Sequence, residues 1–287
     1  MIRRRVELDQ GNGEFRLIAQ DDHARLAGEM AARFGNARFA PPVRGDRTLL
    51  GVSMHDAGWP LHDDRPQLND EGFPSDVFET PIERGVTVWE ASAARAEAAD
   101  PWAGLLVSIH VQRLGGRTDR EVARLGNRDR FLLIRFRNDQ AQRQMRLRTA
   151  LDLRVDRPLD HGLALPTDAE AAADPAEQAL AYDFRLLQAM DLLSLCACCT
   201  NPPAEEIGPL AARPGGRAVR IRVTRPSDTR LLVHPWPFAE SVLMLSVPYT
   251  AVPARPYRDP ADLHAAIDAG RRGSLDVIVE PVRRPLG

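Results

Sequence analysis

Hydrophobic positions in the first 200 residues recur every three or four residues, which is the spacing of one face of an α-helix. This spacing predicts helices at residues 21–34, 49–57, 101–114 and 175–198. The last two stretches each follow an aspartate and begin with proline, a combination typical of a helix N-terminus. Most of this part of the chain is therefore predicted to be helical.

After residue 200 the pattern changes to alternation of apolar and polar residues, which indicates half-buried strands. Residues 218–223 alternate in this way, and further strands are expected at 230–233, 242–247 and 275–279, with a short helix at 259–270. We therefore predict a mainly α fold in two parts. Residues 1–200 would form a helical domain, and residues 201–287 a small C-terminal antiparallel β (α+β) subdomain packed on it.

Ionisable residues interrupt the apolar faces of the predicted helices. His23 and Asp191 both lie on such a face, where an unpaired polar side chain would cost free energy. The adjacent His55 and Asp56 fall in the last turn of the second predicted helix. Imidazole and carboxylate groups together bind divalent metals such as Mn, Fe, Ni, Zn or Mg. The four residues are therefore candidate ligands of one buried metal ion.

Each of these residues also has a purely structural explanation. A core histidine such as His23 can be satisfied by its neighbours, and His55 with Asp56 can cap a helix end. A buried Asp191 needs a cation or several donors, and one of the many arginines can supply the charge. The sequence leaves both explanations open, and the shared metal site accounts for all four residues at once.

The order His, His-Asp, Asp along the chain resembles the HD-domain superfamily of metal-dependent phosphohydrolases, over about residues 15–200. The resemblance implies an HD-domain-like helical bundle in which His23, His55, Asp56 and Asp191 bind the metal. The chain departs from the superfamily after Gly58, where ordinary members often have lysine and this sequence has Trp59.

Several short segments of the sequence are similar to those of a second, more specific group, the bacterial domain-of-unknown-function family 3891. The segments that carry this similarity are QDDHARLAG at 20–28, HDAGW at 55–59, LVSIH at 106–110, MDLLSL at 190–195 and PWPF at 235–238. The similarity extends over nearly the whole chain, and it implies no particular activity.

Two further histidines bear on the number of ions. His110 lies on a helix face and His62 in a loop; if both approach Asp56, its carboxylate can bridge two metals, as in binuclear members of the HD superfamily. With a single metal, His110 is expected to act as general acid or to steady a phosphoryl oxygen. The expected cofactor is one or two ions of a divalent transition metal (Mn, Fe, Ni or Zn) or Mg.

The expected function is metal-dependent hydrolysis of a phosphate ester of a small molecule. Asp56 would be both ligand and proton acceptor, and His110 the second catalytic residue. One alternative is a di-iron oxygenase resembling myo-inositol oxygenase. Another is a non-catalytic ligand-binding or regulatory protein, which Trp59 and the added β unit motivate.

Composition narrows the range of partners. The chain has 287 residues, 44% of them hydrophobic, and a formal net charge of -2, which favours neither nucleic acid nor an anionic membrane. It contains no lysine, and no apolar run of signal-peptide or membrane-spanning length. We expect a cytoplasmic protein with a small-molecule substrate and without nucleic-acid or membrane partners, and a homodimer is compatible with this composition.

Overall fold

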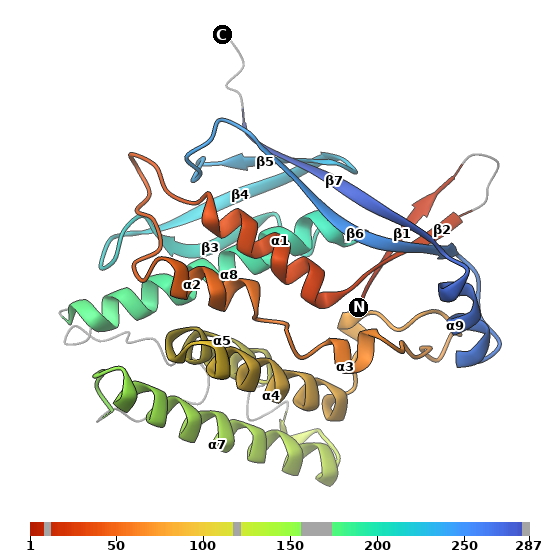
Figure 1. The fold of residues 1–287 in the computed structure, drawn as a ribbon, viewed down its shortest axis with the longest axis horizontal. Coiled ribbons are helices and arrows are strands. Elements are labelled where there is room, and N and C mark those ends of the chain that lie inside the picture. The colour runs from red at the N-terminus through yellow and green to blue at the C-terminus, as the bar shows by residue number, and fades with distance from the viewer. Residues whose placement is uncertain (9–12, 117–121, 156–173, 283–287) are drawn as a thin grey trace.

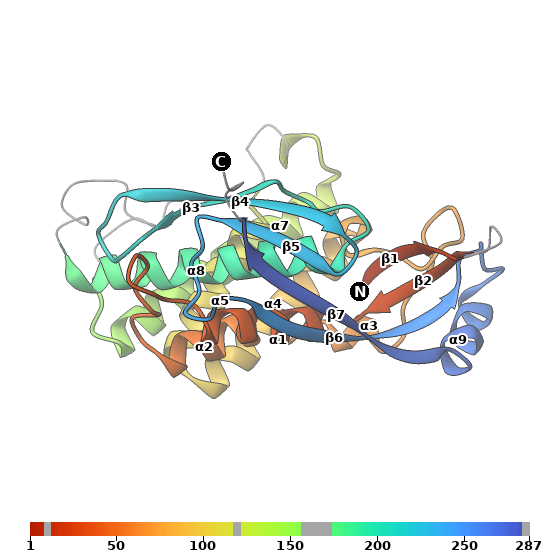
Figure 2. The ribbon, with the colours of Figure 1, turned by 90° about the horizontal axis from the view of Figure 1, so that it is seen from above.

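A computed structural model describes residues 1–8, 13–116, 122–155 and 174–282, in which a seven-stranded sheet curls over several layers of helices (Figure 1; Figure 2). The strands are β1 (Ile2–Glu7), β2 (Gly13–Ile18), β3 (Glu206–Ala211), β4 (Ala218–Ser227), β5 (Arg230–His234), β6 (Leu243–Pro253) and β7 (Arg271–Pro281). The helices are α1 (Gln20–Ala32), α2 (Asp46–Ser53), α3 (Pro60–Asp63), the 3-10 helix η2 (Val77–Glu79), α4 (Ile82–Ala99), α5 (Pro101–Leu114), α7 (Asn127–Ala150), α8 (Pro175–Cys198) and α9 (Pro260–Asp268).

The sheet joins the N-terminal strands to the C-terminal ones. Its strand order is β1-β2-β6-β7-β5-β4-β3, and β2 pairs antiparallel with β6. Strands β5 and β7 are parallel, whereas the other neighbouring pairs are antiparallel. The sheet is thus mixed, and strands from both ends of the described chain form it.

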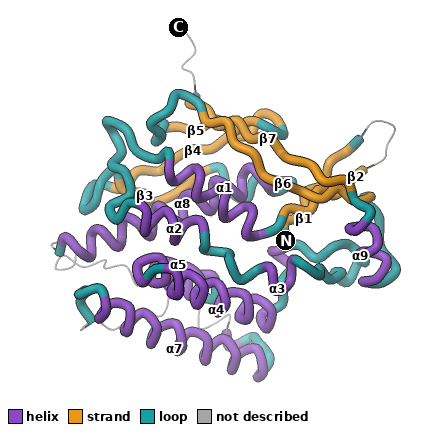
Figure 3. The backbone as a smooth tube through the Cα atoms, in the orientation of Figure 1, coloured by secondary structure: helices purple, strands orange, loops and turns teal. Residues whose placement is uncertain are grey.

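The predicted mainly α, HD-domain-like helical bundle with a small C-terminal antiparallel β subdomain is therefore wrong. The protein has an α/β fold, in which the sheet is a major layer and includes the N-terminal strands β1 and β2 (Figure 3). Because β1 is rich in arginine, its sequence does not show the alternation of apolar and polar residues that predicts a strand. Arg4 is nevertheless buried, because its guanidinium donates to the carbonyl oxygen of Ala197 and pairs with the Asp228 carboxylate at 3.1 Å.

The two helices that the sequence marks with an aspartate followed by proline, α5 and α8, are confirmed. The aspartates Asp100 and Asp174 cap α5 and α8 by accepting backbone N–H groups, and proline follows each of them. The second predicted helix, α2, ends at Ser53, so His55 and Asp56 lie in the turn after it and not in its last turn. In the described part of the chain, no helix combines the length and apolar character needed to span a bilayer.

Helices α1 and α8 pack against one another beneath the sheet. Helix α8 contacts β3, β4 and β5, while α1 contacts β6, and the main hydrophobic core lies between these layers. Helix α5 packs on α2 and α8 on the side away from the sheet, α4 lies beside α5, and α7 packs on both of them from outside (Figure 1). Helices α1, α5 and α8 therefore share one interior region with the turn after α2.

Buried polar groups fix α8 within this arrangement. Asp183 accepts hydrogen bonds from the Val43 N–H at 2.8 Å, the Arg44 N–H at 3.1 Å and the Thr48 hydroxyl at 2.6 Å. At the C-terminal end, Arg225 donates to the carbonyl oxygens of Cys196 and Cys199, where a cation also interacts favourably with the helix dipole. The side chains that α8 presents to the interior are thus held in one position.

The turn that carries His55 and Asp56 is pressed closely against α4. The Gly58 N–H donates to the Ser92 hydroxyl at 2.8 Å. A Cβ atom at position 58 would lie 2.1 Å from the Val88 carbonyl oxygen and 2.6 Å from the Ser92 nitrogen. Only glycine allows this approach of two backbones without displacing the turn.

We predict that Gly58→Ala lowers the free energy of unfolding by about 1–3 kcal/mol, because the added methyl group overpacks the contact with α4. Gly126→Ala is the matched control, since nothing lies within 4 Å of a Cβ built at Gly126. Urea unfolding followed by circular dichroism measures both variants. If Gly58→Ala and Gly126→Ala are equally stable, the close contact of the turn with α4 is contradicted.

Candidate functional site

Five ionisable side chains from four elements meet in the interior between α1, α5 and α8. We call them the His/Asp cluster; they are His23 on α1, His55 and Asp56 in the turn after α2, His110 on α5 and Asp191 on α8. The three imidazoles and Asp56 are buried, while 16% of the Asp191 side chain is exposed. The cluster is therefore enclosed by protein and reaches solvent at Asp191.

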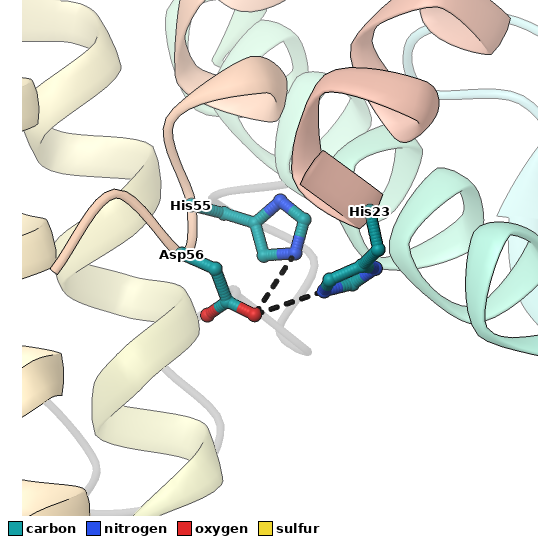
Figure 4. A group of neighbouring side chains, drawn as sticks. All are labelled: His23, His55 and Asp56. Atoms are coloured by element: carbon teal, nitrogen blue, oxygen red, sulfur yellow. Dashed lines mark hydrogen bonds and ion pairs between the residues drawn. The ribbon is translucent and has the colours of Figure 1, made fainter. Parts of the chain in front are cut away.

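His23 is held from both sides of its ring. Its Nδ1 lies 2.8 Å from the Ser194 hydroxyl oxygen, and that hydroxyl donates to the Asp191 carbonyl oxygen at 2.8 Å. Because the only proton of Ser194 is used in this way, His23 Nδ1–H is the donor between the two residues. A neutral His23 then has its lone pair on Nε2, which faces Asp56 Oδ2 at 2.9 Å (Figure 4).

His55 is oriented in the same manner. Its Nδ1–H donates to the Val52 carbonyl oxygen at 2.7 Å, so the lone pair of a neutral ring is again on Nε2. This atom lies 3.3 Å from Asp191 Oδ1 and 3.8 Å from Asp56 Oδ2, yet it has no hydrogen-bond partner among the described residues. The His55 Nε2 atom thus points between two carboxylates without making a well-aligned bond to either.

His110 completes the cluster from α5. Its Nε2 lies 3.8 Å from Asp191 Oδ2, and its Nδ1 is buried without a partner in the described structure. The ring centroid of His55 lies 5.0 Å from that of His23 and 5.2 Å from that of His110, both nearly perpendicular to it. His55 is therefore the centre of the cluster.

The ligand atoms fall into two overlapping groups. His23, His55 and Asp56 form one, and His55, His110 and Asp191 the other; within each, the ligand atoms lie within 4.8 Å of one another. His62, which sequence reasoning placed beside Asp56, belongs to neither group among the residues described. The structure thus brings together five of the six candidate residues and leaves His62 outside.

The charges of the cluster depend on one another. Burial opposes ionisation of Asp56, but the neighbouring His55 and His23 outweigh it and hold the pKa of this carboxyl below its usual value. The pKa of Asp191 is lowered in the same way, chiefly by His55. Burial lowers the pKa of His110 to about 4, so this imidazole is neutral at pH 7. Two carboxylates and at least one neutral imidazole are therefore buried together.

A cation fits this arrangement better than the protein groups fit each other. Metal-binding histidines usually donate their second ring N–H to a fixed oxygen, as His23 and His55 do through Ser194 and Val52. Without a cation, His55 would have to be protonated. Burial opposes protonation of the ring, but the charges of Asp56 and Asp191 outweigh the effect of burial and raise the pKa of His55 to about 9. The unaligned His55 Nε2 shows that the protein groups alone leave a polar atom at the centre of the cluster unsatisfied.

Supporting residues of the site were not recognised in the sequence. Ser194 lies three residues after Asp191, on the same buried face of α8, and this spacing is a signal that could have identified it. Trp59, whose Nε1–H donates to Asp56 Oδ1 at 3.1 Å, was noticed only as a departure from the usual lysine. The Val52 carbonyl oxygen carries no sequence signal, because every residue has one.

Comparison with known families matches most of the chain to a family model. The family described as a protein of unknown function, DUF3891, covers residues 1–254. The chain belongs to this family. No curated protein and no solved structure matches the chain.

We predict that protein purified without chelators contains a divalent metal, and that His55→Ala and Asp191→Ala lose it. Each substitution removes a ligand atom that faces the centre of the cluster. His62→Ala is the control and should retain the metal, because His62 lies outside both groups. Elemental analysis by mass spectrometry measures all four proteins, and a metal-free parent would overturn the prediction.

We further predict that Ser194→Ala weakens metal affinity by about 10–100-fold, because His23 loses the oxygen that orients its ring. Ser108→Ala is matched in size and burial, but its hydroxyl donates to Gln140 on α7, away from the cluster. Competition with a fluorescent chelator gives both affinities. The same affinity in both variants would remove Ser194 from the site.

Proposed function

We propose that this member of the DUF3891 family is a metal-dependent hydrolase that acts on a phosphate ester of a small molecule. His23, His55, Asp56 and Asp191 would hold the ion, with His110 beside them. The coordinating atoms are nitrogen and oxygen only, which suits Mn, Fe, Ni, Zn or Mg.

The observation that carries the proposal is the direction of two imidazole lone pairs. His23 and His55 each use Nδ1–H on an oxygen of the protein, so that both Nε2 atoms face carboxylate oxygens across short gaps. Lone pairs and carboxylates repel one another unless a positive charge lies between them. A divalent cation would supply this charge, and His23, His55, Asp56 and Asp191 are the residues that would hold it.

When bound, a divalent cation would lower the pKa of a coordinated water and polarise the ester. The chain's own groups divide the remaining work. Trp59 fixes Asp56 through Oδ1 and so directs Oδ2 toward the ring of His23. His110 faces the cluster from α5 as a neutral imidazole that can contact a phosphoryl oxygen.

The choice of phosphate-ester hydrolysis rests on the order of the ligands along the chain. The order His, His-Asp, Asp is the one in which the sequence resembles the HD phosphohydrolases, and all four of these residues meet in the cluster. The α/β fold itself gives no support to this choice, so the proposal depends on the site and not on the fold.

We predict that the metal-loaded protein hydrolyses at least one member of a panel of small phosphate esters. Asp56→Asn should lower kcat by about 100-fold or more, because it keeps the shape of the side chain but removes a negative ligand and proton acceptor. Release of inorganic phosphate is the readout. Asp268→Asn on α9 removes a carboxylate remote from the cluster and should leave the rate unchanged.

The same experiment separates the alternatives. Bound iron with oxygen-dependent turnover and no phosphate release would assign an oxygenase instead. A metal-loaded protein that turns over no substrate under air or without oxygen would assign a binding or regulatory role. Substitution of His110 tests the number of ions bound per chain. If the second ligand group holds an ion of its own, His110→Ala should bind one ion where the parent protein binds two.

A further inference from the structure

A small pocket lies on the far side of Trp59 from Asp56. It has a volume of about 30 Å³ and is lined by Met1, Trp59, His62, Asp63, Pro66, Gln67, Ser75, Thr80 and Arg84. A volume of about 10–15 Å³ on this measure holds one water molecule. The pocket therefore accommodates about two water-sized atoms, the size of the pair of oxygens that a carboxylate or phosphate presents.

The lining of this pocket is rich in hydrogen-bond donors that are not used elsewhere. Arg84 makes no hydrogen bond or ion pair with any residue that the structure describes. The same holds for the hydroxyl groups of Ser75 and Thr80 within the described residues. Three residues that line the same pocket thus carry N–H or O–H groups without a partner among the described residues.

His62 adds a further unsatisfied atom. Its Nε2 is buried and has no hydrogen-bond partner among the described residues. Burial, and then the positive charge of Arg84, lower the pKa of His62. The charge of Arg84 therefore acts on the imidazole of His62, and the same charge would attract an anion to the pocket.

The carboxylate in the lining does not cancel this positive charge. Asp63 Oδ1 accepts a hydrogen bond from the N-terminal ammonium of Met1 at 2.6 Å, and Oδ2 accepts one from the Gln20 N–H at 2.7 Å. Both oxygens are therefore occupied, and the charge of Asp63 is balanced by Met1. The charge of Arg84 is left without a counterion in the pocket.

We propose that Arg84, His62, Ser75 and Thr80 form a binding site for an oxyanion, either a carboxylate or a phosphate group. Arg84 supplies the charge and paired N–H donors, and the imidazole and hydroxyls supply the remaining hydrogen bonds. The site is distinct from the His/Asp cluster, whose ligand groups include none of these residues.

Trp59 connects this site with the cluster. Its indole ring lines the pocket, and the N–H of the same ring donates to Asp56 Oδ1 at 3.1 Å. One aromatic ring thus separates the oxyanion site from a proposed metal ligand. If the proposed function holds, the pocket would receive a second acidic group of the substrate. The substrate would then be a phosphate ester that carries a further anionic substituent.

The test measures anion binding in protein treated with excess chelator, so that its outcome does not depend on metal or on turnover. Isothermal titration with inorganic phosphate, and separately with acetate, distinguishes a phosphate from a carboxylate site. Arg84→Gln is expected to weaken binding of the preferred anion by about tenfold or more, because it removes the charge and the paired donors. His62→Gln should weaken it by a smaller factor.

Arg65→Gln is the control, since it removes the charge of an exposed arginine in the same region that does not line the pocket. It should bind phosphate and acetate as the parent does. The proposal is overturned if neither anion binds the parent protein, or if Arg84→Gln and Arg65→Gln change the affinity equally. Thermal unfolding without anion confirms that Arg84→Gln is folded. The metal content of Arg84→Gln should match that of the parent protein. A loss of anion binding is then independent of whether the cluster binds metal.

Discussion

Two carboxylates and three imidazoles meet in the interior of this protein, where all but Asp191 are buried, and the central helices are arranged around them. Helices α1, α5 and α8 and the turn after α2 each contribute at least one member of the cluster. Buried ionised groups are costly unless opposite charge and hydrogen bonds compensate them. The surrounding structure provides part of that compensation through Ser194, the Val52 carbonyl and Trp59, and the proposed cation would supply the rest.

The same constraint explains why the supporting elements are so firmly connected. Asp183 ties α8 to the segment before α2, and Arg225 satisfies carbonyl oxygens at the C-terminus of α8. Asp63 on α3 accepts the first N–H of α1, three residues before His23. Each contact limits the movement of an element that carries a ligand, and metal coordination requires positions fixed to a few tenths of an ångström.

The site has two regions of opposite character on either side of one indole ring. On one side, the His/Asp cluster offers lone pairs and negative charge to a cation. On the other, Arg84 and its neighbours offer donors and positive charge to an anion. Under the two proposals, a substrate with an ester and a separate acidic group would contact both regions, with Trp59 between them.

The residues of the His/Asp cluster were recognisable in the sequence, whereas the sheet was not. Polar residues on apolar helix faces identified His23, His110 and Asp191, because a buried polar group requires a partner whatever the tertiary structure. Local signals also located α5 and α8, since an aspartate cap followed by proline acts within one helical turn.

Only the tertiary structure decided the sheet and the exact composition of the site. Strand β1 contains Arg4, whose burial depends on the carbonyl of Ala197 and the carboxylate of Asp228, both distant in sequence. The place of His62 depends likewise on the direction of the chain after Trp59, which the close contact of Gly58 with α4 determines. A sequence pattern reports the need for a partner, but long-range packing decides which partner is within reach.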